Sequence, residues 1–119
     1  MREIKFRGKF LCTGEWVYGD LIHKRYDRGA VMIQDENGMG YDVDPESVGQ
    51  YTGIRDADGK EIYEGDTIDV ENFQAYIVFL PQQGGFVIVY KDCDRPLYGG
   101  SGHYRSDIRV TGTIHDKKE

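Results

Sequence analysis

The chain has 119 residues, of which 39% are hydrophobic and 13% aromatic; this is enough apolar material for a packed core and disfavours intrinsic disorder. The formal net charge of −6 disfavours non-specific binding to nucleic acid, which depends on neutralising phosphates. The two distant cysteines are typical of cytosolic thiols, and no apolar run resembles a secretion signal or a membrane span. We therefore expect a cytoplasmic protein with no membrane partner.

The charge is distributed unevenly along the chain. Residues 1–30 contain seven basic side chains and four acidic ones, although acidic residues outnumber basic ones by 21 to 15 overall. A basic surface near the N-terminus would favour contacts with phosphate groups, whereas scattered charge would only keep the protein soluble. Both interpretations stay open, and the scattered surface is the simpler one.

Alternating polar and apolar residues predict strands in the first part of the chain, because successive side chains of a strand point to opposite faces. Gly19 and Asp20 are expected to interrupt the second strand. The pair Asn37-Gly38 is a strong hairpin signal, since both residues tolerate the positive φ of a type I′ turn. The predicted strands cover residues 3–7, 16–22, 31–33 and 39–43.

A short helical turn is predicted immediately after these strands. Asp44 can accept hydrogen bonds from exposed backbone amides, and Pro45 suits the first position of a helix. The turn must be brief, because Gly49 follows it closely.

From residue 49 onward the pattern is one of short strands and tight turns. Six strands in this length suit a small closed or nearly closed barrel, which leaves few strand edges exposed. Residues 92–107, rich in glycine, aromatic and charged side chains, predict a long loop. The strands are expected at residues 50–55, 60–63, 67–70, 75–80, 86–90 and 108–114, with Gly112 marking a bulge in the last.

Four segments of the chain resemble the YopX family, whose members are small proteins encoded by bacteriophages and prophages. They read MREIKFR at the start, WVYGDLI at 16–22, DPESVGQYTGIRDADGKEIYEGD at 44–66 and VTGTIHD at 110–116. The resemblance spans nearly the whole chain and is weaker across residues 72–107. It implies no established activity, so it assigns no catalytic residue.

The resemblance also implies a mainly β fold in two parts. Residues 49–119 would form an SH3-like barrel. Residues 1–48 would form an additional β-rich subdomain, with a hairpin and a short helical turn. Together they would make one compact unit of the kind expected for this family.

The acidic segment DADGKE at residues 56–61 has some features of a calcium-binding loop. An EF-hand loop needs glycine at its sixth position and glutamate at its twelfth, between two helices. Here Gly59 occupies the fourth position, and the flanking residues predict strands. A solvated hairpin turn is therefore favoured over a calcium site.

Three further carboxylates lie close together in the sequence, and such groups can serve as a general acid and base. They are Glu61, Glu64 and Asp66. However, Gly65 followed by Asp66 is typical of a tight turn, in which the aspartate binds neighbouring amides. The turn is the preferred interpretation.

The histidines and cysteines do not have the spacing of metal ligands. His23, His103 and His115 are far apart, and adding Cys12 and Cys93 produces no C-x-x-C or H-x-x-x-H pattern. Phosphate-binding, dinucleotide-binding and nucleophile motifs are also missing from the sequence. The sequence thus predicts no metal, no cofactor and no catalytic residue.

The glycine-rich loop near the C-terminus is the preferred place for a binding surface, because it combines aromatic rings with a cation. Its candidate partner-binding residues are Tyr98, His103, Tyr104 and Arg105. The alternative is a connecting loop whose tyrosines pack on the barrel.

Three functions follow, in order of preference. The first is a non-enzymatic binding or accessory module whose partner is a phage or host protein. The second is a nucleic-acid-binding module, favoured by the basic N-terminal residues and the aromatic side chains. The third is an enzyme with an unrecognised site, in which carboxylates would converge with His103. Self-association through strand edges of the N-terminal part is also left open.

Overall fold

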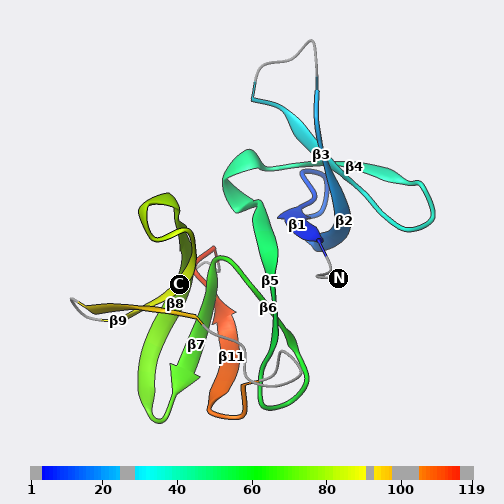
Figure 1. The fold of residues 1–119 in the computed structure, drawn as a ribbon. Coiled ribbons are helices and arrows are strands. Elements are labelled where there is room, and N and C mark those ends of the chain that lie inside the picture. The colour runs from blue at the N-terminus through cyan, green and yellow to red at the C-terminus, as the bar shows by residue number, and fades with distance from the viewer. Residues whose placement is uncertain (1–3, 25–28, 91–92, 98–104, 116–119) are drawn as a thin grey trace. The chain divides into compact units, whose positions relative to one another are not determined.

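The computed structural model describes residues 4–24, 29–90, 93–97 and 105–115, and its regular elements are β-strands and two 3-10 turns (Figure 1). The mainly β fold predicted from the sequence is therefore confirmed. The chain divides into two compact units, residues 1–51 and residues 52–119. The boundary falls inside the fifth strand.

The first unit is a meander of antiparallel strands. Its first four strands are neighbours in both sequence and space, and the start of the fifth pairs with the free side of the first. The strands are β1 (Phe6–Lys9), β2 (Trp16–His23), β3 (Val31–Gln34), β4 (Gly40–Val43) and β5 (Gly49–Arg55).

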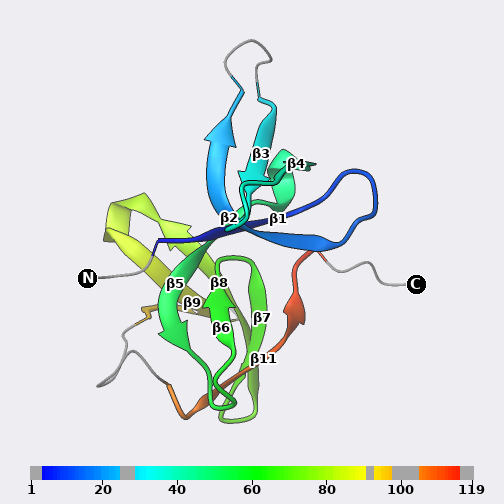
Figure 2. The ribbon, with the colours of Figure 1, turned by 90° about the vertical axis from the view of Figure 1, so that its right-hand side faces the viewer.

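The prediction that Gly19 and Asp20 interrupt the second strand is wrong. β2 is continuous but changes partner here: residues up to Gly19 pair with β1, and those from Asp20 pair with β3. Figure 2 shows the strand bending between its two halves. The bend needs a glycine, because a Cβ atom at position 19 would overlap the backbone carbonyl oxygen of Gln34.

The sheet of the first unit coils until its first and fourth strands meet. Beyond β1, Phe10 forms a bridge with Val43, and the amide of Leu11 donates to the carbonyl oxygen of Asp42 at 2.9 Å. Gly8 permits the approach, since a Cβ atom there would lie 2.9 Å from that of Val43. The outer edge of β4 is therefore partly paired within the chain, which limits the edge on which self-association was expected.

The helical turn predicted at residues 44–47 is confirmed as the 3-10 turn η1 (Pro45–Ser47). An Asp44 side-chain oxygen accepts from the amide of Glu46 at 3.1 Å, as the capping prediction required. Ser47 is buried; its hydroxyl accepts from the amide of Lys9 and donates to the carbonyl of Asp44. These bonds fasten the turn to the end of β1.

The core of the first unit lies between the coiled strands. Its buried members are Val31, Ile33 and Val43, from β3 and β4. Partly buried apolar side chains surround them: Phe6, Val17, Leu21, Tyr41 and Val48. All eight are hydrophobic, so burying them supplies the main driving force for this unit.

The second unit contains a five-stranded antiparallel sheet in the order β10-β9-β8-β7-β11. The strands are β7 (Asp66–Val70), β8 (Phe73–Leu80), β9 (Gly85–Tyr90), β10 (Cys93–Pro96) and β11 (Ile108–Thr113). The second half of β5 and β6 (Glu61–Tyr63) form a hairpin that packs Ile54 and Ile62 against isoleucines of the sheet. Because β10 and β11 are its edges, the sheet is not closed.

Most predicted strands of this unit are confirmed, including the hairpin β8–β9, which turns through the 3-10 turn η2 (Pro81–Gln83). The bulge is also confirmed, since the register of β11 shifts between Val110 and Gly112. The prediction of a continuous loop over residues 92–107 is wrong for 93–96, where β10 pairs with β9. Pairing along the edge of β9 satisfies backbone groups that a loop would leave to water.

The type I′ turn was predicted at the wrong place. In the described part of the chain, the non-glycine residues with positive φ are Glu71 (φ 50°) and Asn72 (φ 77°), which form the two-residue link between β7 and β8. At the predicted position, Gln34 pairs with Gly40, so the loop has five residues and only Gly38 has positive φ. Its shape is set by the side chain of Asp35.

We expect Gly19→Ala to destabilise the protein by about 3 kcal/mol, because the added methyl overlaps the backbone of Gln34 and the strand must move. The measurement is urea unfolding. Gly85→Ala is the matched control, since a Cβ atom at that strand position meets nothing within 4 Å; it should change the free energy of unfolding by about 0.5 kcal/mol or less. Equal effects of the two substitutions would contradict the explanation.

Candidate functional site

The loop preferred from the sequence is described only at its end. Tyr98, His103 and Tyr104 lie outside the described residues. Arg105 is described: its guanidinium makes two hydrogen bonds to the carboxylate of Asp107, at 2.9 and 2.8 Å. Its amide donates to the carbonyl oxygen of Arg55 at 2.9 Å. The side chain of Arg105 is therefore committed to an ion pair within the second unit.

This ion pair changes the protonation of both partners. The hydrogen bond from Arg105 lowers the pKa of Asp107 below its ordinary value of 3.8, although desolvation acts in the opposite direction. The same hydrogen bond raises the pKa of the guanidinium. Both groups stay charged at neutral pH, so neither is suited to proton transfer.

The acidic segment at 56–61 forms a turn, as predicted. Asp56 is only 1% exposed, and one of its oxygens accepts from the amides of Asp58 and Lys60 at 2.9 and 2.8 Å. Its other oxygen accepts from the amide of Val110 in β11 at 2.9 Å. The carboxylate therefore joins the β5–β6 hairpin to the last strand, and these atoms are occupied by the fold.

Two of the three neighbouring carboxylates, those of Asp66 and Glu61, make contacts within the fold. Asp66 is 1% exposed and accepts from the amide of Tyr63 at 2.7 Å, which confirms the turn interpretation. Glu61 accepts from the Tyr63 hydroxyl at 3.0 Å and pairs with Arg55 at 3.6 Å. Within the described ranges, no three acidic, histidine or cysteine side chains are grouped so that they could hold a metal ion.

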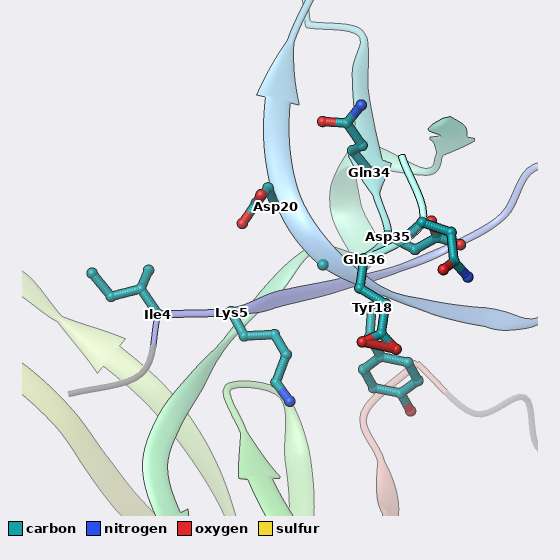
Figure 3. A pocket seen from close by; sticks show the side chains of 9 residues that line it. Ile4, Lys5, Tyr18, Asp20, Gln34, Asp35 and Glu36 are labelled. Carbon is teal, nitrogen blue, oxygen red and sulfur yellow. The ribbon is translucent and has the colours of Figure 1, made fainter. Parts of the chain in front are cut away.

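A hollow of about 440 Å³ in the first unit is a candidate binding site among the described residues. It is lined by the segment before β1 (residues 4–5), the middle of β2 (residues 18–20), and the end of β3 with the turn that follows it (residues 34–37). Figure 3 shows Ile4 and Lys5 on one side, the turn on the other and Asp20 between them. Three segments distant in sequence thus face one shared space.

The bend of β2 and the turn after β3 shape this hollow. At Gly19 the backbone of β2 comes so close to Gln34 that a side chain would not fit. Asp35 then fixes the turn: one oxygen accepts from the amides of Asn37 and Met39 at 3.0 and 2.9 Å. Its other oxygen lies 3.4 Å from the hydroxyl of Tyr41. The wall opposite β1 is therefore held by the backbone.

The turns at Asp35 and Asp56 follow one sequence pattern, an aspartate two residues before Asn-Gly or Asp-Gly. In each, the aspartate accepts from the amides two and four residues further on. The glycine pairs indicated these turns, but the bonds made by the preceding aspartate were not predicted. This spacing is the signal that could have indicated the second wall of the hollow.

The rim of the hollow combines exposed apolar and charged groups. Ile4 is 60% exposed and Tyr18 is 45% exposed, so both apolar side chains are accessible at the edge of the hollow. Asp20 and Glu36 are also exposed, and neither side chain forms a hydrogen bond or ion pair with the residues described. The arrangement offers contact area and charge, without a buried acid or nucleophile for chemistry.

The described basic residues near the N-terminus do not form one open surface. Lys5, Arg7 and Lys9 alternate along β1 and share one face, where Arg7 lies 4.3 Å and Lys9 5.4 Å from the centre of the Trp16 ring. Arg7 is only 5% exposed. Lys24 pairs with Asp42 at 2.6 Å. The remaining basic residues of this region, at positions 2, 25 and 28, lie outside the described part.

Comparison with known proteins identifies the family. A family model described as YopX protein matches residues 5–119, nearly the whole chain, so the chain belongs to the YopX family. The resemblance noted in the sequence is thereby confirmed. No curated protein matches the chain. Within the described residues, no helix has the length and apolar character needed to cross a membrane.

We expect Asp56→Asn to destabilise the protein by about 3 kcal/mol, because the amide group cannot replace a carboxylate that accepts from three backbone amides in a buried position. Asp58→Asn is the matched control. It removes the same charge, but Asp58 pairs with Arg109 at the surface, where both side chains are 63% exposed. This substitution should lower the free energy of unfolding by about 0.5 kcal/mol or less. Chemical unfolding measures both; similar losses would contradict the assignment.

The Arg105–Asp107 pair predicts a pH-dependent contribution to stability. Because the pKa of Asp107 is lowered by folding, the contribution is complete above about pH 4 and is lost as the pH falls through the lowered value. At neutral pH, Asp107→Asn should cost about 0.5 kcal/mol, since the pair is partly exposed. Urea unfolding of both proteins between about pH 7 and pH 2 tests this. A difference that grows on acidification would refute it.

Proposed function

We propose that this protein is a non-enzymatic binding module of phage or prophage origin, acting in the bacterial cytoplasm on a protein partner. The hollow in the first unit is the observation that carries the proposal. Its rim exposes Ile4 and Tyr18, and it has charged groups at its sides. Exposed apolar side chains, among them a tyrosine, beside charged groups offer the kinds of contact that protein–protein interfaces use.

We also propose that the second unit is a partly open SH3-like barrel that serves as scaffold. One core supports this: Ile54 and Ile62 of the β5–β6 hairpin are buried together with Ile68, Ile77 and Ile108 of the sheet. A hairpin packed over a sheet encloses a core on both sides, as in a small barrel. The role of scaffold is supported by the buried carboxylate of Asp56, which joins the β5–β6 hairpin to β11.

Binding to nucleic acid is the second candidate, and the three cations on one face of β1 favour it. Against it, Arg7 is buried beneath Trp16 and Lys9 lies over the same ring. A cation on a ring occupies a face on which a base would stack. Two lysines would neutralise few phosphates, so binding would be weak and strongly reduced by salt.

The test of the main proposal is capture of a partner by the full-length protein from a phage-infected bacterial lysate. We expect Ile4→Ser combined with Tyr18→Ser to reduce recovery of the partner about tenfold or more, because the two exposed apolar side chains of the rim are lost. Circular dichroism and unfolding confirm that the variant folds. The readout is the amount of each captured protein relative to the wild type.

Leu11→Ser is the matched control, because Leu11 is 64% exposed in the same unit and does not line the hollow. It should leave recovery unchanged. If the wild type captures nothing, or if the rim variant captures as much as the control, the proposal is wrong. Retardation of a nucleic-acid probe at low salt by the wild type, but not by the double variant Lys5→Gln, Lys9→Gln, would favour the second candidate.

A further inference from the structure

The charges of the hollow are unequal. Three carboxylates line it, those of Asp20, Asp35 and Glu36, against the single ammonium of Lys5. Lys5 lies 5.7 Å from the centre of the Tyr51 ring, and Figure 3 shows its side chain extending away from Asp20. The described lining of the hollow therefore carries an excess of negative charge, which favours a cation over an anion.

Two of the three carboxylates are available to a ligand. Asp35 is engaged by the amides of its own turn and by Tyr41. Asp20 and Glu36, by contrast, are exposed, and their side chains make no hydrogen bond or ion pair among the described residues. They project from β2 and from the β3–β4 turn, so a cation entering between these elements can pair with either one.

The shape and the apolar groups favour an organic cation over a metal ion. Within the described residues, no cluster of three acidic, histidine or cysteine groups could hold a metal ion. The hollow measures about 440 Å³, much larger than an ion. It also presents the exposed ring of Tyr18 and the exposed side chain of Ile4. An aromatic ring attracts a cation over its face, and an aliphatic side chain packs against methylene groups.

We propose that the hollow receives an arginine side chain of the protein partner. The guanidinium pairs with Asp20 or Glu36 and lies against the ring of Tyr18, while the methylene stem packs on Ile4. Arginine fits better than lysine because its planar group can both stack on a ring and make two parallel hydrogen bonds to a carboxylate. This inference rests on the proposed function and specifies the chemistry of the partner.

The test uses the full-length protein and the capped peptide Gly-Ala-Arg-Ala-Gly, followed by amide chemical shifts in NMR. We expect millimolar binding with shifts at Tyr18, Gly19 and the amides of residues 34–37. Replacing arginine by citrulline, which keeps the shape and removes the charge, should weaken binding about tenfold. Raising the salt to about 0.5 M should weaken it further, because the charges are exposed.

Asp20→Asn with Glu36→Gln should abolish the shifts. The matched control is Glu15→Gln with Glu46→Gln, which changes the net charge equally at exposed positions outside the hollow and should bind as the wild type does. The inference is overturned if a peptide with citrulline or glutamate in place of arginine binds as well as the arginine peptide. It is also overturned if no peptide changes the amide chemical shifts of the hollow, or if the control variant loses binding as completely as the Asp20→Asn, Glu36→Gln variant.

The outcome is separable from that of the proposed function. Suppose that capture of a partner depends on Ile4 and Tyr18 but is unchanged in the Asp20→Asn, Glu36→Gln variant. The proposal of a binding module would then be retained, and the arginine assignment would be overturned. Failure of the capture experiment together with specific binding of the arginine peptide would instead retain the site and remove the proposed protein partner.

Discussion

Each unit depends on an aspartate whose carboxylate accepts hydrogen bonds from several backbone amides. In the second unit Asp56 is almost fully buried and accepts from three amides, two in its own turn and one from Val110 in the last strand. Removing a carboxylate from water is costly unless hydrogen bonds replace its hydration, and here the amides do so. The same contact gives three amides their partners, so the hairpin and β11 are stabilised together.

The first unit uses the same turn for a different result. Asp35 also fixes the amides two and four residues further on, but its turn stays at the surface and its third contact is a tyrosine hydroxyl. Because the backbone holds this turn, the exposed carboxylate of Glu36 is presented from a defined position. One local motif therefore stabilises a core in one unit and forms the wall of a candidate site in the other.

Burial explains why so few of the conspicuous polar residues are candidates for function. Two acids of the central segment that attracted attention in the sequence, Asp56 and Asp66, are buried in the fold. Arg105, the described member of the glycine-rich loop, is held by Asp107. The polar groups of the hollow are less conspicuous in the sequence, because Asp20 follows a strand glycine and Glu36 lies within a turn. These two acids are candidates for binding because they are exposed on the same hollow as Tyr18.

Most strands, most turns and the family could be predicted from the sequence, because alternation of side chains, turn residues and motif spacing are local properties. The capping of a short turn by Asp44 was predicted in the same way. The tertiary structure was needed to show that β2 continues through Gly19, that residues 93–96 form an edge strand, and that the sheet of the second unit stays open. It alone brought residues 4–5, 18–20 and 34–37 around one hollow. These features depend on pairing between distant segments, and the local pattern of a strand does not specify which partner it will have.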